Sequence, residues 1–141
     1  MIRQVDIDNL LQETLLDEGA KDHLIHLHCF RRTVERVRPW ISRFPNLMVG
    51  FTPRIENREV VREVPLTRIL LETDAPYFTP YGKARPSKPW YVMDTAREIS
   101  QIKETPLDQI LCTCFDNAYR FYNLQKFGVF DGKTLNSSCS L

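Results

Sequence analysis

Two short groups of residues have the types and spacing for chemistry, and the first is Glu72-Thr73-Asp74. It follows an apolar run that predicts a strand, and alternation along a strand places Leu70, Glu72 and Asp74 on one face. Two carboxylates then converge where a parallel sheet or barrel places its active site. Because like charges are costly in partly buried positions, a divalent metal would stabilise them. In the alternative, Asp74 caps the next turn and Glu72 pairs with an arginine.

The second group is His26-Leu27-His28, within another predicted strand. The two-residue period of a strand directs both imidazoles to the same side. At this separation they can hold one metal ion or two neighbouring ones. An incidental pair of histidines is the alternative, and the spacing alone does not decide between them.

Two further segments suggest contact with a polyanion. Between Arg31 and Arg62 the chain has eight arginines against three glutamates, which indicates either a phosphate-binding surface or solvated helix faces. The predicted loop over residues 77–89 offers Tyr77 and Arg85 for substrate contact, since aromatic rings stack on bases and arginine binds phosphate with two hydrogen bonds.

The composition is that of one ordinary globular domain. The chain has 141 residues, of which 43% are hydrophobic and 26% charged, and its net charge of +1 provides no general attraction for nucleic acid. Neither a signal peptide nor a membrane span is expected. The four cysteines are interpreted as reduced thiols. We therefore expect a cytoplasmic or nuclear protein that is not secreted.

Helical and strand patterns alternate along the chain. Such an order predicts an α/β fold with parallel strands and helical crossovers. The expected helices follow Asp8 and Asn9 as far as Gly19 and cover residues 33–44, 56–63, 90–102 and 106–121, and the expected strands cover residues 23–30, 46–51 and 68–73.

The motifs in this order resemble the C-terminal half of the TatD-type metal-dependent deoxyribonucleases. The resemblance lies in HLHCF (residues 26–30), FPNLMVGFTP (44–53), PLTRILLETDAPYFTP (65–80) and NAYRFYNL (117–124). It implies a partial TIM (β/α)8 barrel containing about the last three strands with their helices. Residues 1–127 would form this truncated hydrolase barrel, and residues 128–141 a frayed tail.

The resemblance also implies roles for individual residues. His28 matches a metal or phosphate-site ligand, and Asp74 matches a metal ligand that also accepts a proton. Glu72 has a supporting role, whereas His26 matches no ligand of the family and stays a second choice. The implied cofactor is a divalent metal (Mg, Mn or Zn), and the implied substrate is DNA, single-stranded DNA included, often cut from a 3′ end.

A truncated barrel raises the question of activity. A full barrel needs about 250 residues, and the family's ligands on the first, fourth and fifth strands have no counterpart here. We therefore expect impaired activity, and a partner chain or self-association that covers open sheet edges and apolar side chains such as Ile69 and Leu71. The alternatives are a non-catalytic fragment that binds nucleic acid or protein through its arginine-rich middle, and a hydrolase acting on another substrate.

Overall fold

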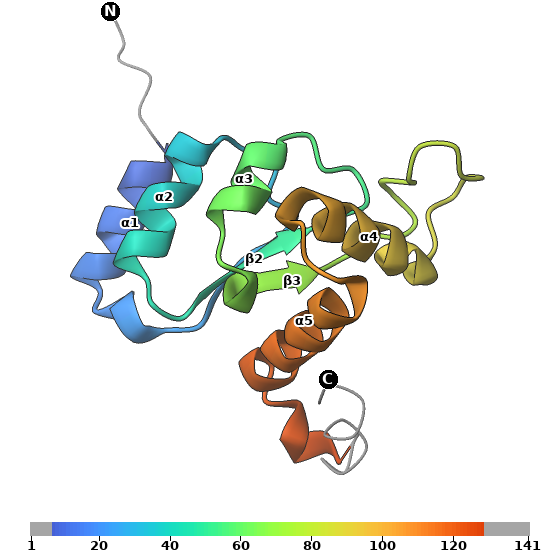
Figure 1. Cartoon of the computed structure of the whole chain (residues 1–141). Helices are drawn as coiled ribbons and strands as arrows, with labels where there is room; N and C mark the ends of the chain where they lie inside the picture. The colour runs from blue at the N-terminus through green and yellow to red at the C-terminus, as the bar shows by residue number, and fades with distance from the viewer. Residues whose placement is uncertain (1–6, 129–141) are drawn as a thin grey trace, which may run out of the picture.

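The computed structural model describes residues 7–128, in which helices alternate with three strands (Figure 1). The predicted N-terminal and C-terminal ends, including most of the expected frayed tail, lie outside the described residues. In chain order the α-helices and strands are α1 (Ile7–Asp17), β1 (Ile25–Leu27), α2 (Val34–Arg43), β2 (Leu47–Phe51), α3 (Arg58–Glu63), β3 (Ile69–Leu71), α4 (Val92–Lys103) and α5 (Leu107–Phe121).

The three strands form one parallel sheet in the order β1-β2-β3. His26 lies opposite Met48, and Gly50 lies opposite Leu70. The carboxyl ends of all three strands therefore meet at one edge of the sheet. This arrangement confirms the predicted α/β fold with parallel strands and helical crossovers.

The helices begin and end at residues that suit these positions. The Asn57 side chain accepts the backbone N–H of Glu59 and caps α3. Helix α4 ends at Glu104, which adopts the left-handed conformation. In Figure 1, α2, α3 and α4 lie along one side of the sheet, and α5 lies beside β3.

The core lies between the sheet and these helices. Leu47, Val49 and Ile69 are fully buried, together with Val37 from α2 and Ile99 from α4. The expectation that Ile69 belongs to an uncovered apolar face is therefore wrong, because the crossover helices already cover that face. Leu71 is half-buried and packs against the same core.

Two strands are shorter than predicted, and both end next to a residue in the left-handed conformation. Cys29 has a φ of 46° and follows β1 closely, whereas Asp74 has a φ of 49° and follows β3. A positive φ interrupts the extended backbone that a strand requires. The backbone therefore turns at the carboxyl edge of the sheet, directly beside the two groups of residues predicted to do chemistry.

The described cysteines differ in their oxidation state. Cys29 and Cys114 are free, but Cys112 is disulfide-bonded, which contradicts the interpretation of this residue as a reduced thiol. The spacing of cysteines along the chain does not reveal which of them the fold brings together. Cys139 lies outside the described residues.

Within residues 7–128, no helix combines the length and apolar character needed to cross a membrane.

Candidate metal centre

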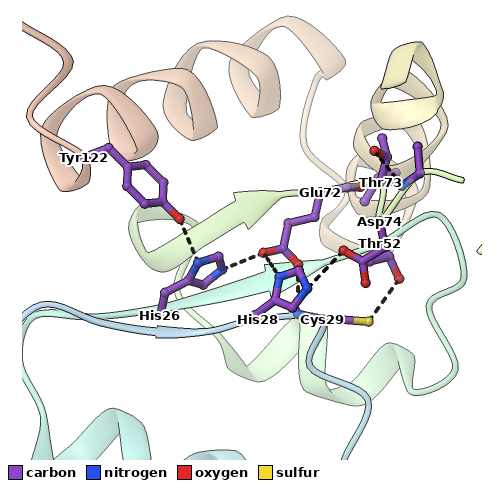
Figure 2. A network of polar contacts seen from close by, with 10 residues as sticks. His26, His28, Cys29, Thr52, Glu72, Thr73, Asp74 and Tyr122 are labelled. Carbon is purple, nitrogen blue, oxygen red and sulfur yellow. Dashed lines mark hydrogen bonds and ion pairs between the residues drawn. The ribbon is translucent and has the colours of Figure 1, made fainter. Parts of the chain in front are cut away.

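Four predicted side chains converge at the carboxyl edge of the sheet, as Figure 2 shows. Glu72 Oε1 lies 2.6 Å from His26 Nε2 and 2.9 Å from His28 Nδ1. On its other side, His28 Nε2 lies 3.1 Å from Asp74 Oδ1. The structure thus brings together both histidines of one motif and both carboxylates of the other. The two motifs are distant in the sequence, since 44 positions separate His28 from Glu72.

The position of Glu72 depends on the backbone around it. The N–H of Cys29 donates to Glu72 Oε2 at 2.8 Å. Gly50 leaves the space that the carboxylate occupies, since a Cβ atom at this position would lie 2.3 Å from Glu72 Oε1. Glu72 contacts two imidazoles and a backbone N–H, whereas no arginine contacts it among the described residues. This observation disfavours the alternative of a Glu72–arginine pair.

The contacts of Glu72 determine its charge. Burial by itself raises the pKa of this carboxyl group. The contacts with His26, the N–H of Cys29 and His28 together lower the pKa by more than burial raises it, so the pKa lies below its usual value. Hydrogen bonding to Glu72 raises the pKa of His28, against a smaller opposing effect of burial. The edge of the sheet therefore holds a carboxylate that stays ionised at neutral pH.

Asp74 and Cys29 complete the surroundings of His28. The Asp74 side chain is 14% exposed, compared with 63% for His28, so the carboxylate is much better shielded from solvent than the imidazole that it contacts. The thiol of Cys29 lies 3.8 Å from Thr52 Oγ1. Burial, together with the hydrogen bond to Asp74, raises the pKa of this thiol to about 11, so Cys29 stays a neutral neighbour of the charged groups.

The donor set fits a divalent metal ion. His26, His28 and Glu72 each offer one ligand atom, and these atoms lie within 4.8 Å of one another. His26 Nε2 is buried and lies 2.6 Å from Glu72 Oε1, in an ion-pair contact without the geometry of a hydrogen bond. A cation bound between these atoms would contact both, and imidazole and carboxylate are ligands for zinc and manganese.

The structure does not bring the predicted substrate residues into this cluster. Tyr77 is 72% exposed and begins the loop between β3 and α4, in which Arg85 is also exposed. Within residues 7–128, neither side chain contacts the histidines or the carboxylates. Both nevertheless belong to the segment that leaves the carboxyl edge directly after Asp74.

The arginine-rich middle of the chain is engaged within the fold. Six of its arginines contact a carboxylate, which offsets part of their positive charge, and Arg43 and Arg54 contact neutral oxygen acceptors. Arg31 contacts Glu56, Arg32 and Arg36 contact Asp8, Arg38 contacts Glu63, Arg43 contacts Gln12, Arg54 contacts the Thr79 carbonyl, Arg58 contacts Glu98, and Arg62 contacts Glu59.

The sequence motifs did not identify two residues of the site, Tyr122 and Gly50. Tyr122 lies at the end of α5, and its hydroxyl group is 2.7 Å from His26 Nδ1. Gly50 provides the space for Glu72. A glycine inside a predicted strand is a signal for a close approach, and could have identified Gly50. No local signal connects Tyr122 with His26, because 96 residues separate them.

The fold and the site together define a class of protein, a parallel α/β fold with a candidate metal centre at the carboxyl edge of its sheet, the edge at which α/β barrels have their active sites. The sequence profile described as TatD related DNase matches residues 2–123. The chain therefore belongs to the TatD related DNase family.

Curated relatives have names that agree with this family. The human 3'-5' RNA nuclease TATDN2 is 38% identical over 132 residues, which cover 86% of this chain and 17% of the relative. The metal-dependent hydrolase YabD of Bacillus subtilis is 31% identical over 115 residues, which cover 78% and 45%. The human deoxyribonuclease TATDN3 is 28% identical over 114 residues, which cover 81% and 40%. The chain thus spans less than half the length of each of these relatives.

A solved structure supports the fold. The TatD homologue YJJV of Escherichia coli K12 superimposes with a TM-score of 0.71 at 20% identity, over 84% of this chain and 47% of that one. The predicted partial barrel is therefore confirmed as the fold of this chain.

Proposed function

We propose that residues 1–127 form the C-terminal part of a metal-dependent phosphodiester hydrolase, a deoxyribonuclease that removes nucleotides from a 3′ end. The observation that carries the proposal is the convergence of His26, His28, Glu72 and Asp74 at the carboxyl edge of the sheet. The names of the relatives support a nuclease. The proposed substrate is DNA, single-stranded DNA included.

His28 and Asp74 are the proposed ligands of a divalent metal ion (Mg, Mn or Zn), with Glu72 and His26 beside them. A bound divalent cation acidifies water to a pKa of about 7 and offsets the charge of phosphoryl oxygens. The close grouping of the ligand atoms of His26, His28 and Glu72 and the lowered pKa of Glu72 support this assignment.

Asp74 is the proposed catalytic residue, because its carboxylate can accept the proton that the attacking water releases. His28 Nε2 lies 3.1 Å from Asp74 Oδ1, so the two side chains are close enough to share one metal ion. Glu72 contacts the other nitrogen of His28, Nδ1, at 2.9 Å and would orient the imidazole.

Tyr77 and Arg85 are the proposed contacts with the nucleic acid. The segment of residues 77–91 contains several aromatic and basic residues and no aspartate or glutamate. Exposed aromatic rings stack on bases regardless of sequence, and basic side chains bind the phosphates. The strand would then run along this loop toward Asp74 at the edge of the sheet.

The proposal includes a partner and a location. Strands β1 and β3 are the outer strands of the sheet, and a partner chain or a second copy would pair with their free edges. A cytoplasmic or nuclear location accords with a nucleic-acid substrate.

The test is cleavage of labelled single-stranded DNA and RNA by the full chain, with Mn²⁺ or with EDTA. We expect metal-dependent shortening from the 3′ end, reduced about 10²- to 10⁴-fold by Asp74→Asn. Asp108→Asn, an acidic residue in the first turn of α5, is the matched control and should leave cleavage unchanged. A folded, metal-bound chain that cuts no nucleic acid would contradict the proposal, and hydrolysis of other esters or amides alone would favour a different substrate.

The arginine-rich alternative has its own signature. Salt-sensitive binding of DNA that survives EDTA and Asp74→Asn, but is lost when Arg31, Arg32 and Arg36 are neutralised, would favour a non-catalytic binding fragment. The internal pairing of these arginines leads us to expect the opposite result.

A further inference from the structure

Tyr122 reaches the candidate metal centre from a distant part of the chain. It follows directly after α5, and its hydroxyl group lies 2.7 Å from His26 Nδ1 (Figure 2). The rings of His26 and Tyr122 lie 6.2 Å apart in an edge-on arrangement, and Phe121 packs against the same imidazole at 6.1 Å. The orientation of His26 is therefore set from the end of α5.

This contact bears on what the second nitrogen of the ring can do. Nδ1 lies against the Tyr122 hydroxyl group, which can accept or donate a hydrogen bond, while Nε2 lies 2.6 Å from Glu72 Oε1. A neutral imidazole carries one proton, so in the tautomer in which Nδ1–H donates to the tyrosine oxygen, Nε2 has a lone pair for a metal ion. In metal sites the ligating histidine commonly donates its other N–H to such a fixed acceptor.

We propose that Tyr122 is a positioning residue that makes His26 a metal ligand through Nε2. The proposal rests on the proposed function, since it concerns the same site, and it adds a ligand for which the resemblance to the family offers no counterpart. The added ligand lies on β1, and His28 follows directly after the end of this strand. Because the described residues contain three strands, the added ligand strengthens a site that has few ligands of its own.

The first experiment is a double-mutant cycle on metal affinity, measured by isothermal titration of the full chain with Zn²⁺. Tyr122→Phe keeps the ring that packs on His26 and removes only the hydroxyl group. We expect it to weaken Zn²⁺ binding about tenfold, the lower end for lost partners of metal ligands. His26→Ala should weaken binding at least as much, and the double variant should match His26→Ala alone, because Tyr122 acts only through His26.

A matched control removes a hydroxyl group elsewhere. Tyr81→Phe, at a residue that is 85% exposed in the β3–α4 loop, should leave Zn²⁺ affinity unchanged. The metal-free melting temperature should be the same for Tyr122→Phe and the unmodified chain. An equal loss of affinity from Tyr122→Phe with and without His26 would overturn the inference, as would no loss at all.

The second readout is the protonation of His26, observed by long-range ¹H–¹⁵N correlation of the Zn²⁺-loaded chain. We expect Nδ1 to carry the proton and Nε2 to show the shift of a coordinated nitrogen. A protonated Nε2 in the loaded chain would contradict the inference.

Variants of the other ligands separate this inference from the proposed function. If His28→Ala and Glu72→Gln abolish Zn²⁺ binding while Tyr122→Phe and His26→Ala do not weaken it, the metal site stands and only the role of Tyr122 is wrong. If none of the four variants changes the affinity, the proposed metal site itself is wrong.

Discussion

The two faces of the three-stranded sheet differ in character: one packs against the helices in the apolar core, and the other holds the polar cluster of the candidate site. On the face toward the helices, Leu47, Val49 and Ile69 are fully buried in an apolar core. On the other face, His26, Gly50 and Glu72 form part of a polar cluster at the carboxyl edge. The helix-covered face is apolar, whereas the cluster face contains partly buried charged groups in close contact. In β1 and β2, the residues for stability thus alternate with those that line the candidate site.

Two glutamates show how the surroundings decide between these purposes. Glu98 on α4 lies beside α3, 3.9 Å from Arg58, and burial raises its pKa against the weaker effect of that arginine. Glu72 is also buried in large part, but three close contacts lower its pKa. Partial burial alone therefore does not set the charge of a carboxyl group, because close donors can outweigh desolvation.

The largest effect on stability is expected from the helix-covered face. Ile69→Ala removes a fully buried side chain and should lower the free energy of unfolding by about 2–5 kcal/mol. Met48→Ala, on the opposite face and only partly buried, should cost less than half as much. Urea unfolding of both variants measures the difference, and equal losses would break the distinction between the faces.

A metal ion bound at the cluster should raise the free energy of unfolding by an amount comparable to the loss expected for Ile69→Ala. At 100 times its dissociation constant, Zn²⁺ or Mn²⁺ should add about 2.7 kcal/mol to the free energy of unfolding, relative to EDTA. Thermal melts followed by circular dichroism measure this gain. Glu72→Gln should lose the gain, whereas Glu98→Gln should keep it. A gain of the same size in both variants would show that the metal binds elsewhere.

Gly50→Ala should separate stability from metal binding. The new methyl group would lie 2.3 Å from Glu72 Oε1, so the carboxylate, the far end of a flexible side chain, must move away from the histidines. We expect Zn²⁺ affinity to fall about tenfold, which corresponds to about 1.4 kcal/mol. The free energy of unfolding should change by less than about 1 kcal/mol, because alanine restricts the unfolded chain more than glycine does. Unchanged affinity in a calorimetric titration would rule out this role for Gly50.

The smallest expected effect is a pH-dependent change in the melting temperature caused by Glu98→Gln. The folded-state pKa of Glu98 is raised, so the folded chain binds its proton more tightly than the unfolded chain does. This carboxyl group therefore lowers stability as the pH rises above about 4.5, the value for the unfolded chain. We expect Glu98→Gln to raise the melting temperature by about 1–2 °C at pH 8 and by nothing near pH 4. A larger gain at pH 4 than at pH 8 would reverse this sign.

Local patterns predicted the order of the elements and the family. Alternation correctly directed His26 and His28 to the same side, where both contact Glu72, although His28 lies one residue beyond β1. The helical periods of α4 and α5 followed from their apolar spacing. The extent of the strands was overestimated, because Cys29 is not a residue type that favours a positive φ, and aspartate, which tolerates one, does so at only a minority of positions.

The sequence by itself determined which residues share a face, since the two-residue period of a strand and the helical period are local properties of the backbone. It thereby determined the apolar face, the four polar residues of the cluster and the family. Only the tertiary structure decided which side chains meet: Tyr122 with His26, Gly50 with Glu72, and the arginines with their acidic partners. These contacts join residues far apart in the chain, and the packing of helices on strands, which no local period encodes, sets their geometry.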